Sequence, residues 1–280
     1  MSQTEVAQAK AMMSTTVDKT KMYVSLDQSQ AYSEFRPRYN DDLFRAIVDF
    51  CKETNPNLNL AVDVGCGPGM STIGFCKYFK KVMGVDVSET QVACAPKDIP
   101  NCEFKVGYSD KLPFIKSGSV DLFCSGESFN LMPHKETFAE ADRVLRPGGT
   151  IALFGYDVLR ADKPEINEVI QKMFVKFLPY WPKESTLIFD KFRDITLPYS
   201  DYKRREDLKI VDKMNLEQYL GLMKSLWPFV AYCKDHPEVD LAKELRTDMT
   251  NVLAKVNKPG DTTFDIAWDM FILMGHKPGK

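Results

Sequence analysis

The glycine-rich stretch Val62-Asp63-Val64-Gly65-Cys66-Gly67-Pro68-Gly69 carries the most information about the fold of this chain of 280 residues. It follows an apolar run that begins at Leu58, and a segment of helix length begins directly after it at Met70. Glycine permits a sharp turn and lets a ligand approach the backbone, because no Cβ lies in the way. The free N–H groups at the start of the following helix would point at whatever the loop holds. The stretch therefore predicts a strand, a ligand-binding turn and a helix in succession.

Short apolar segments alternate with segments of helical spacing around this loop. We expect strands at 58–64, 82–87, 102–106, 120–125 and 150–156, and helices at 70–79, 89–95 and 135–145. Such alternation predicts right-handed crossovers and a parallel sheet with helices on both faces, which is an α/β fold. Outside this region, helices are expected to begin after Asn40 and Asn215, and a last extended segment is expected from Phe264 to Met274.

Two acidic residues indicate which ligand the loop holds. Asp86 ends the second predicted strand, where a carboxylate can accept two hydrogen bonds from a ribose diol. The loop spacing is G-x-G-x-G, not the G-x-G-x-x-G that is typical of a pyrophosphate site. Asp63 precedes the loop, where a carboxylate would repel a diphosphate and attract an ammonium group. S-adenosylmethionine satisfies both conditions, because it carries a sulfonium and an ammonium group and no phosphate.

The ordered set of motifs resembles that of the class I S-adenosylmethionine-dependent methyltransferases. Residues 62–69 and 84–88 resemble their first two motifs, and residues 107–114 resemble the stretch that surrounds the adenine. Residues 119–123 are similar to their fourth strand, and residues 143–149 are similar to the turn before their fifth. The resemblance implies a Rossmann-like methyltransferase fold with a mostly parallel seven-stranded sheet, helices on both faces and a helical cap. It also implies S-adenosyl-L-methionine as the cofactor and an activity of the EC 2.1.1 class.

The front of the chain points to one branch of these enzymes. The pattern Tyr32-x-x-x-Arg36-Pro37-x-Tyr39 resembles the N-terminal cap of small-molecule methyltransferases of the trans-aconitate and juvenile hormone acid type. The resemblance implies that Arg36 pairs with the cofactor carboxylate and that Tyr32 lies near the sulfonium. Because this stretch is short, basic and interrupted by Pro37, we also expect roughly residues 20 to 40 to form a lid that becomes ordered when the ligand binds. Taken together, the residues predicted to bind the cofactor are Tyr32, Arg36, Asp63, Gly65, Gly67, Gly69, Asp86, Val87, Ser109, Asp110, Ser125 and Gly126.

The sequence does not identify a single catalytic residue. Relatives often have a histidine and a tryptophan shortly after the fourth strand, and this chain has Asn130 and Leu131 there. An asparagine cannot take up a proton near neutral pH. His134 is the best candidate for a base, although an exposed loop histidine is the alternative. Further candidates lie at strand ends or in the same loop, namely Glu127, Tyr156 and Asn130 itself.

Composition excludes several classes of protein. Lys and Arg number 37 against 39 Asp and Glu, a net charge of -2, so a nucleic acid is not expected as the main partner. No apolar run is long enough to span a membrane, and the first residues lack the apolar region of a signal peptide. The seven cysteines contain no C-x-x-C pair, so neither a metal site nor a redox motif is expected. A cytoplasmic location is therefore predicted.

The sequence predicts four parts in chain order. They are a mobile tail at 1–22, a lid and helix at 23–57, a cofactor-binding core at 58–156, and a substrate cap with the final strands at 157–280. The function that fits best is methyl transfer to a small-molecule carboxylate, hydroxyl or amine. A catalytically silent cofactor-binding regulatory protein and an NAD-dependent dehydrogenase remain as alternatives, and the oligomeric state stays open.

Overall fold

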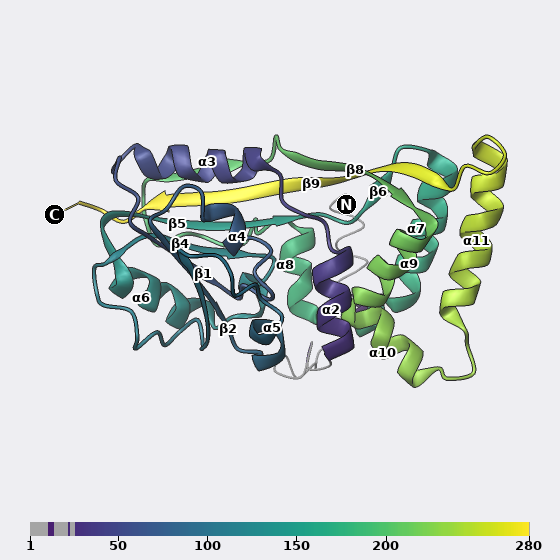
Figure 1. The fold of residues 1–280 in the computed structure, drawn as a ribbon, viewed down its shortest axis with the longest axis horizontal. Coiled ribbons are helices and arrows are strands. Elements are labelled where there is room, and N and C mark those ends of the chain that lie inside the picture. The colour runs from purple at the N-terminus through teal and green to yellow at the C-terminus, as the bar shows by residue number, and fades with distance from the viewer. Residues whose placement is uncertain (1–10, 14–21, 23–25, 280) are drawn as a thin grey trace. The chain divides into compact units, whose positions relative to one another are not determined.

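A computed structural model describes residues 11–13, 22 and 26–279 of the chain (Figure 1). Most of the predicted tail and the first residues of the predicted lid therefore lie outside the described residues. The chain divides into two compact units, each built from separate stretches of sequence. Unit 1 comprises Met1–Pro37, Asp157–Asp190 and Lys209–Asp269, and unit 2 comprises Arg38–Tyr156, Lys191–Leu208 and Met270–Lys280.

Unit 2 is built on a sheet in which seven strands follow the order β3-β2-β1-β4-β5-β9-β7. The strands β1 to β5 pair in parallel, whereas β9 is antiparallel to both β5 and β7. The central strands β1 and β4 are buried almost throughout, which explains their continuous apolar runs. The strand bounds are Leu60–Val64 (β1), Lys81–Asp86 (β2), Cys102–Val106 (β3), Val120–Gly126 (β4), Leu145–Tyr156 (β5), Tyr202–Arg205 (β7) and Thr263–His276 (β9). The predicted fold class is confirmed.

Helices cover this sheet. Figure 1 shows α3 (Asp41–Lys52) on one side of β5 and α6 (His134–Val144) on the other. Asn40 is the N-cap of α3, as predicted, because its side chain accepts a hydrogen bond from the backbone N–H of Leu43 at 3.3 Å. The shorter helices of the unit are α4 (Thr72–Phe75), α5 (Glu89–Ala93) and the 3-10 turn η2 (Phe129–Leu131).

The helix predicted at 70–79 is wrong in length, because α4 spans only Thr72–Phe75. The side chain of Asn101 donates to the carbonyl groups of Cys76 at 2.7 Å and Phe79 at 2.9 Å. Gly74 within the predicted helix lowers helix propensity further. A residue distant in sequence thus takes up carbonyl groups at the point where the helix ends.

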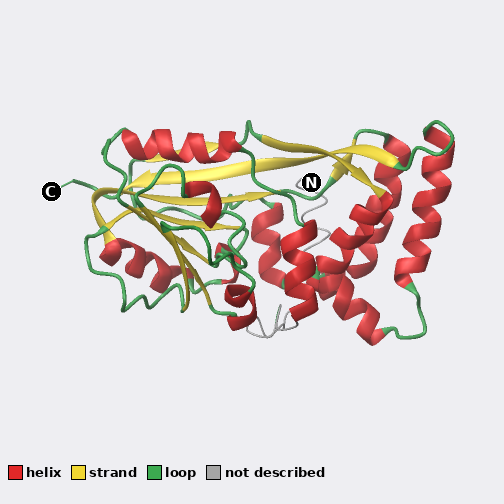
Figure 2. Cartoon of the chain, viewed as in Figure 1, coloured by secondary structure: helices red, strands yellow, loops and turns green. Residues whose placement is uncertain are grey.

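Unit 1 is mainly helical, with two additional strands (Figure 2). The strands β6 (Arg160–Ala161) and β8 (Lys209–Asn215) pair with the first half of β9. The complete sheet therefore has nine strands, and the predicted count of seven holds only for unit 2. The fourteen residues of β9 extend beyond its pairing with β5, and this extension accepts the two extra strands.

The helices of unit 1 pack on one another through aromatic side chains. Their bounds are Leu26–Phe35 (α2), Pro164–Phe177 (α7), Thr186–Phe189 (α8), Leu216–Ser225 (α9), Trp227–Asp235 (α10) and Leu241–Val256 (α11), with 3-10 turns at Leu178–Tyr180 (η3) and Lys183–Ser185 (η4). The start of α9 is confirmed, since Asn215 and Gln218 form a reciprocal capping box. The ring of Phe35 lies against Gly221, where a Cβ would come within 2.5 Å of it. None of the described helices is long and apolar enough to cross a membrane.

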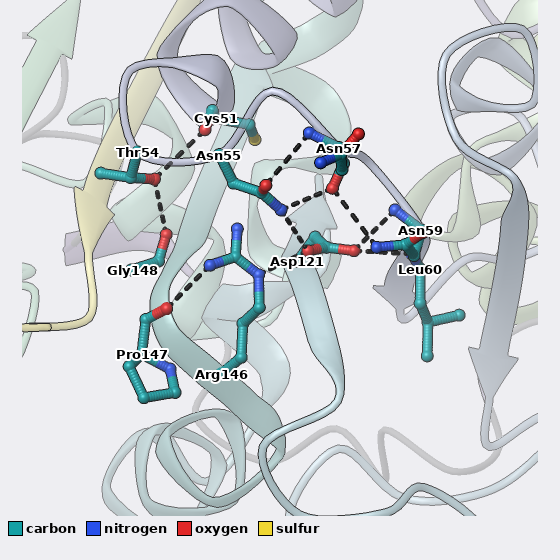
Figure 3. A network of polar contacts seen from close by, with 10 residues as sticks. All are labelled: Cys51, Thr54, Asn55, Asn57, Asn59, Leu60, Asp121, Arg146, Pro147 and Gly148. Carbon is teal, nitrogen blue, oxygen red and sulfur yellow. Dashed lines mark hydrogen bonds and ion pairs between the residues drawn. The ribbon is translucent and has the colours of Figure 1, made fainter. Parts of the chain in front are cut away.

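A polar network ties strands together at the amino ends of β1 and β4 (Figure 3). The buried carboxylate of Asp121 accepts hydrogen bonds from the backbone N–H groups of Asn59 at 2.7 Å and Leu60 at 2.8 Å. It also accepts from the side chains of Asn55 at 2.9 Å and Arg146 at 2.5 Å. A buried charge is tolerated when it is paired and fully hydrogen-bonded. Arg146 and the turn around it therefore stabilise the sheet at the edge opposite the glycine loop.

Candidate cofactor site

The glycine loop between β1 and α4 adopts a backbone that favours glycine at three positions. The φ angles are +67° at Gly65, +54° at Gly67 and +92° at Gly69. A Cβ on Gly65 would lie 2.5 Å from the Cβ of Ser128, and one on Gly69 would lie 2.7 Å from the ring of Phe104. A Cβ on Gly67 would meet nothing among the described residues within 4 Å. The absence of a side chain at Gly65 and Gly69 therefore leaves room for Ser128 and Phe104 to pack against the loop. Gly67 instead faces open space in which a ligand can lie.

Asp86 is bound to this loop from the end of β2. Its Oδ2 accepts a hydrogen bond from the N–H of Gly67 at 2.8 Å, and its Oδ1 accepts from the N–H of Ser88 at 2.8 Å. Burial raises the pKa of the Asp86 carboxyl, and the two N–H donors oppose that shift. Each carboxylate oxygen can accept a further hydrogen bond. Asp86 thus holds the loop in shape and can also receive the hydroxyls of a ribose.

Asp63 has a structural role in addition to the one that the sequence predicts. Its side chain is fully buried, and its Oδ2 accepts hydrogen bonds from the hydroxyls of Ser71 at 2.6 Å and Thr72 at 2.7 Å. Burial raises the pKa of Asp63 to about 6, although these donors and Cys124 lower it. The carboxylate therefore anchors the start of α4, a role that the sequence analysis missed. Its attraction for an ammonium group stays a prediction.

We expect Asp63→Asn to raise the free energy of unfolding at pH 7 by about 1–2 kcal/mol. The folded-state pKa of about 6 lies above the ordinary value of 3.8, so the folded state binds more protons than the unfolded state between these values. The contribution of Asp63 to stability accordingly falls as the pH rises from about 4 to about 6. An asparagine can still accept from Ser71 and Thr72 without ionising.

Urea unfolding between pH 4 and pH 7 measures this effect, and the same change at the exposed Asp110 is the control. The Asp63 variant should lose part of the wild-type decline in stability over that range, and the Asp110 variant should keep it. A variant at Asp63 that is less stable than wild type at pH 7, with the same decline, would contradict the expectation.

The predicted adenine side lies at the carboxyl ends of β2 and β3. Ser109 is turned inward, and its hydroxyl lies 2.9 Å from that of Thr137. Asp110 next to it is exposed, so the carboxylate of Asp110 is more accessible than the hydroxyl of Ser109. The side chains of Val87 and Tyr108 are also exposed, at 41% and 62%. Accessible apolar surface beside an accessible carboxylate suits a planar base with an amino group.

Two buried side chains near the carboxyl end of β4 each carry an oxygen with no hydrogen-bond partner in the part of the chain that the structure describes. Ser125, which precedes Gly126, is completely buried, and its Oγ has no hydrogen-bond partner among the described residues. Asn130 in η2 is 4% exposed, and its Oδ1 likewise has none in that part of the chain. An unpaired buried polar group costs about 1–3 kcal/mol. These oxygens fit a ligand that supplies N–H or O–H donors, and the α-ammonium group of S-adenosylmethionine is such a donor.

Glu127 and Tyr156, two of the catalytic candidates, are brought together by the structure. The Oε1 of Glu127 accepts a hydrogen bond from the backbone N–H of Tyr156 at 2.6 Å. Glu127 has a φ of +58°, a strained backbone for a residue with a Cβ, and such strain is common at functional sites. The ring of Tyr156 lies 5.9 Å from that of Tyr39. Glu127 is thus fixed at the strand end where a ligand would bind.

His134 is the first residue of α6 and is half-buried, so it is not a histidine in an exposed loop. Its ring stacks on Phe129 with centroids 4.6 Å apart, and its Nε2 lies 3.1 Å from the carbonyl oxygen of Phe129. Nε2 must therefore carry the proton in that bond, which makes Nδ1 the basic atom. No group of three or more His, Cys, Asp or Glu side chains among the described residues could hold a metal ion.

Tyr32 and Arg36 belong to unit 1, in and directly after α2. The guanidinium carbon of Arg36 lies 4.7 Å from the centre of the Tyr32 ring, a cation–π contact. The two residues are thus neighbours, as their spacing on a helix requires. Their roles toward the cofactor stay predictions.

The chain resembles known methyltransferases in sequence and in fold. Residues 62–153 match the family described as a methyltransferase domain. A Dictyostelium discoideum protein described as a methyltransferase is 27% identical over 255 residues, which cover 89% of this chain and 93% of that protein. The probable S-adenosylmethionine-dependent methyltransferase CRG1 of Saccharomyces cerevisiae is 29% identical over 186 residues, which cover 64% of this chain and 61% of CRG1.

A solved structure supports the same assignment of the fold. A protein from Anaeromyxobacter dehalogenans described as a type II methyltransferase superposes with a TM-score of 0.73, at 24% identity, over 88% of this chain and 100% of that chain. The glycine loop, Asp86 and most of the parallel strands around them lie in the region that matches the family. Residues 62–153 therefore match a methyltransferase domain, which supports S-adenosyl-L-methionine as the cofactor, and the chain has a Rossmann-like methyltransferase fold.

Proposed function

We propose that this protein is an enzyme that transfers the methyl group of S-adenosyl-L-methionine to a small-molecule carboxylate, hydroxyl or amine. The observation that supports it best is that two buried oxygens near the carboxyl end of β4, on Ser125 and Asn130, have no hydrogen-bond partner among the described residues. Ligands of open α/β sheets bind at that edge. A net charge of -2 disfavours a nucleic acid as the acceptor, because no bulk positive field attracts phosphates.

The residues of this chain would mainly bind the cofactor and orient the acceptor. When bound, S-adenosyl-L-methionine supplies a methyl group on a positively charged sulfur, and transfer is an in-line displacement. Gly67 leaves room for the cofactor, and Asp86 would fix its ribose. The remaining task is to align the acceptor and exclude water. A carboxylate acceptor needs no base, whereas a hydroxyl or amine gives up a proton that Glu127 or the Nδ1 of His134 could receive.

The small-molecule branch is supported by the pattern Tyr32-x-x-x-Arg36-Pro37-x-Tyr39. We propose the trans-aconitate and juvenile hormone acid type on that pattern alone. A reducing compartment such as the cytoplasm fits seven cysteines that form no disulfide.

A catalytically silent regulatory protein is the main alternative, because Asn130 stands where relatives often carry a histidine. The match to a methyltransferase domain disfavours the NAD-dependent dehydrogenase. Calorimetry with S-adenosylhomocysteine and with NAD distinguishes a site for S-adenosyl-L-methionine from a site for a dinucleotide. Binding of NAD without binding of S-adenosylhomocysteine would overturn the proposal.

Transfer of a labelled methyl group tests the enzyme directly. The full chain is incubated with labelled S-adenosyl-L-methionine and fractions of a small-molecule extract, and labelled products are identified by mass spectrometry. A variant that has lost cofactor binding is the control for uncatalysed methylation. We expect label in a discrete product only with the wild-type protein. Binding of S-adenosylhomocysteine without transfer to any fraction would support the silent alternative.

A further inference from the structure

The hydroxyl of Ser128 connects the carboxyl ends of β1 and β4. In the sheet order, β2 and β3 lie on one side of β1, and β4 and β5 lie on the other. Ligands of open α/β sheets bind in the crevice where the strand order reverses in this way. The Oγ of Ser128 lies 2.8 Å from the carbonyl oxygen of Gly65, which follows β1, and 3.1 Å from that of Gly126, which ends β4. A hydroxyl has one proton, so Ser128 donates to one of these oxygens or shares the proton between both.

Ser128 holds the glycine loop from the side opposite to Asp86. From β2, the carboxylate of Asp86 accepts a hydrogen bond from the N–H of Gly67 at 2.8 Å. From the segment after β4, Ser128 donates to the carbonyl oxygen of Gly65. A Cβ on Gly65 would lie 2.5 Å from the Cβ of Ser128 and 2.8 Å from the methyl carbon of Met132, so both side chains pack on the loop there. The loop is therefore held from both strands that neighbour β1.

The same contacts fix the position of Asn130. Ser128 and Met132 flank the 3-10 turn η2, which contains Asn130. The turn is closed by a hydrogen bond of 3.0 Å from the N–H of Leu131 to the carbonyl oxygen of Ser128. Because both flanking residues contact Gly65, the turn is held beside the glycine loop. The buried Oδ1 of Asn130, which has no hydrogen-bond partner among the described residues, is thus fixed relative to that loop.

The order of the strands indicates which part of the cofactor lies at this point. The proposed site assigns the adenine to the ends of β2 and β3, and the ribose to Asp86 at the end of β2. The amino acid part then lies over the ends of β1 and β4, which follow in the sheet. Its ammonium group offers three N–H donors, and the oxygens of Ser125 and Asn130 can accept from them.

We propose that Ser128 is a positioning residue, whose hydroxyl sets the distance between the glycine loop and Asn130 so that both hold the amino acid part of the cofactor. This inference rests on the cofactor site proposed above. Loss of the hydroxyl would leave the Cβ that packs against Gly65 in place and would remove the polar link between the ends of β1 and β4. The amino acid part would then be bound less tightly, whereas the adenosine part would still be bound by Asp86.

Calorimetry with two ligands tests the proposal. S-adenosylhomocysteine carries the amino acid part, and 5′-methylthioadenosine has the adenosine and the sulfur without it. We expect Ser128→Ala to weaken the binding of S-adenosylhomocysteine by about fivefold, the scale of one hydrogen bond, and to leave 5′-methylthioadenosine nearly unaffected. Ser119→Ala is the matched control, because the hydroxyl of Ser119 also donates to a carbonyl oxygen, that of Lys116 at 2.6 Å, at the amino end of β4. The control should bind both ligands as the wild-type protein does.

The double variant Ser128→Ala, Asn130→Ala distinguishes positioning from a direct contact with the cofactor. Asn130→Ala alone should also weaken S-adenosylhomocysteine selectively. Because Ser128 acts through Asn130, the loss of affinity in the double variant should be smaller than the product of the two single losses. Losses that simply multiply would overturn the positioning role.

Two results with the single variant would also overturn it. One is unchanged affinity of Ser128→Ala for S-adenosylhomocysteine. The other is an equal loss of both ligands, which would show a general structural effect of the hydroxyl. A wild-type protein that binds neither ligand would refute the cofactor site instead, so the two failures are distinguishable.

Discussion

Gly67→Ala is expected to weaken the binding of S-adenosylhomocysteine by a factor of 100 or more while the protein stays folded. A Cβ at this position meets nothing among the described residues within 4 Å, so it does not disturb internal packing. It would instead stand in the open space above the loop that the proposed site assigns to the cofactor. A 100-fold loss corresponds to about 2.7 kcal/mol, which is a reasonable cost for a methyl group placed in a close backbone contact.

Gly118→Ala is a matched control for the backbone. Gly118 has a φ of +65°, close to the +54° of Gly67, and its Cβ would also meet nothing within 4 Å among the described residues. The two variants should therefore lose a similar stability of about 1–2 kcal/mol. Gly118 lies in the turn before β4, at the amino end of that strand. Calorimetry should show weaker binding for the Gly67 variant alone, and equal losses in both would point to a general effect of strain.

The strands could be predicted because their signal is local. Parallel strands that are covered on both faces must be apolar throughout, and the five predicted runs all became strands. The prediction failed where a distant residue decides the outcome. The helix after the loop ends early where Asn101 binds the carbonyl groups of Cys76 and Phe79. The two extra strands exist because β9 continues past its pairing with β5, which the alternation of its residues does not reveal.

The site shows the same division between local and distant effects. The glycines and Asp86 were predicted from their spacing, and the structure joins them by a hydrogen bond of 2.8 Å between Gly67 and Asp86. The anchoring role of Asp63 depends on hydroxyls eight and nine residues later, which turn back onto it. Burial without a partner, as at Ser125, is a property of the folded chain only.

Asp86→Ala is expected to weaken binding of S-adenosylhomocysteine by about 1.5–3 kcal/mol, because hydrogen bonds to a charged group are lost. The loss has two sources, the bonds to the ribose and the bond that holds the N–H of Gly67. Asp98→Ala, a change of the same kind at an exposed position, should leave the affinity unchanged. Both variants should unfold cooperatively in urea, which shows that the measured loss is one of binding. Unchanged affinity in a folded Asp86 variant would mean that the ribose is held by other residues.

The double variant Gly67→Ala, Asp86→Ala separates these two sources. If Asp86 acts partly by holding the loop at Gly67, that part of its effect is already lost when the methyl group of Gly67→Ala blocks the loop. The loss of binding free energy in the double variant should then be smaller than the sum of the losses in the two single variants. A coupling energy of at least about 0.5 kcal/mol is expected for residues in direct contact. Strict additivity would show that Asp86 acts on the ribose alone. The hydrogen bond between Asp86 and Gly67 would then be a feature of the empty loop that cofactor binding does not use.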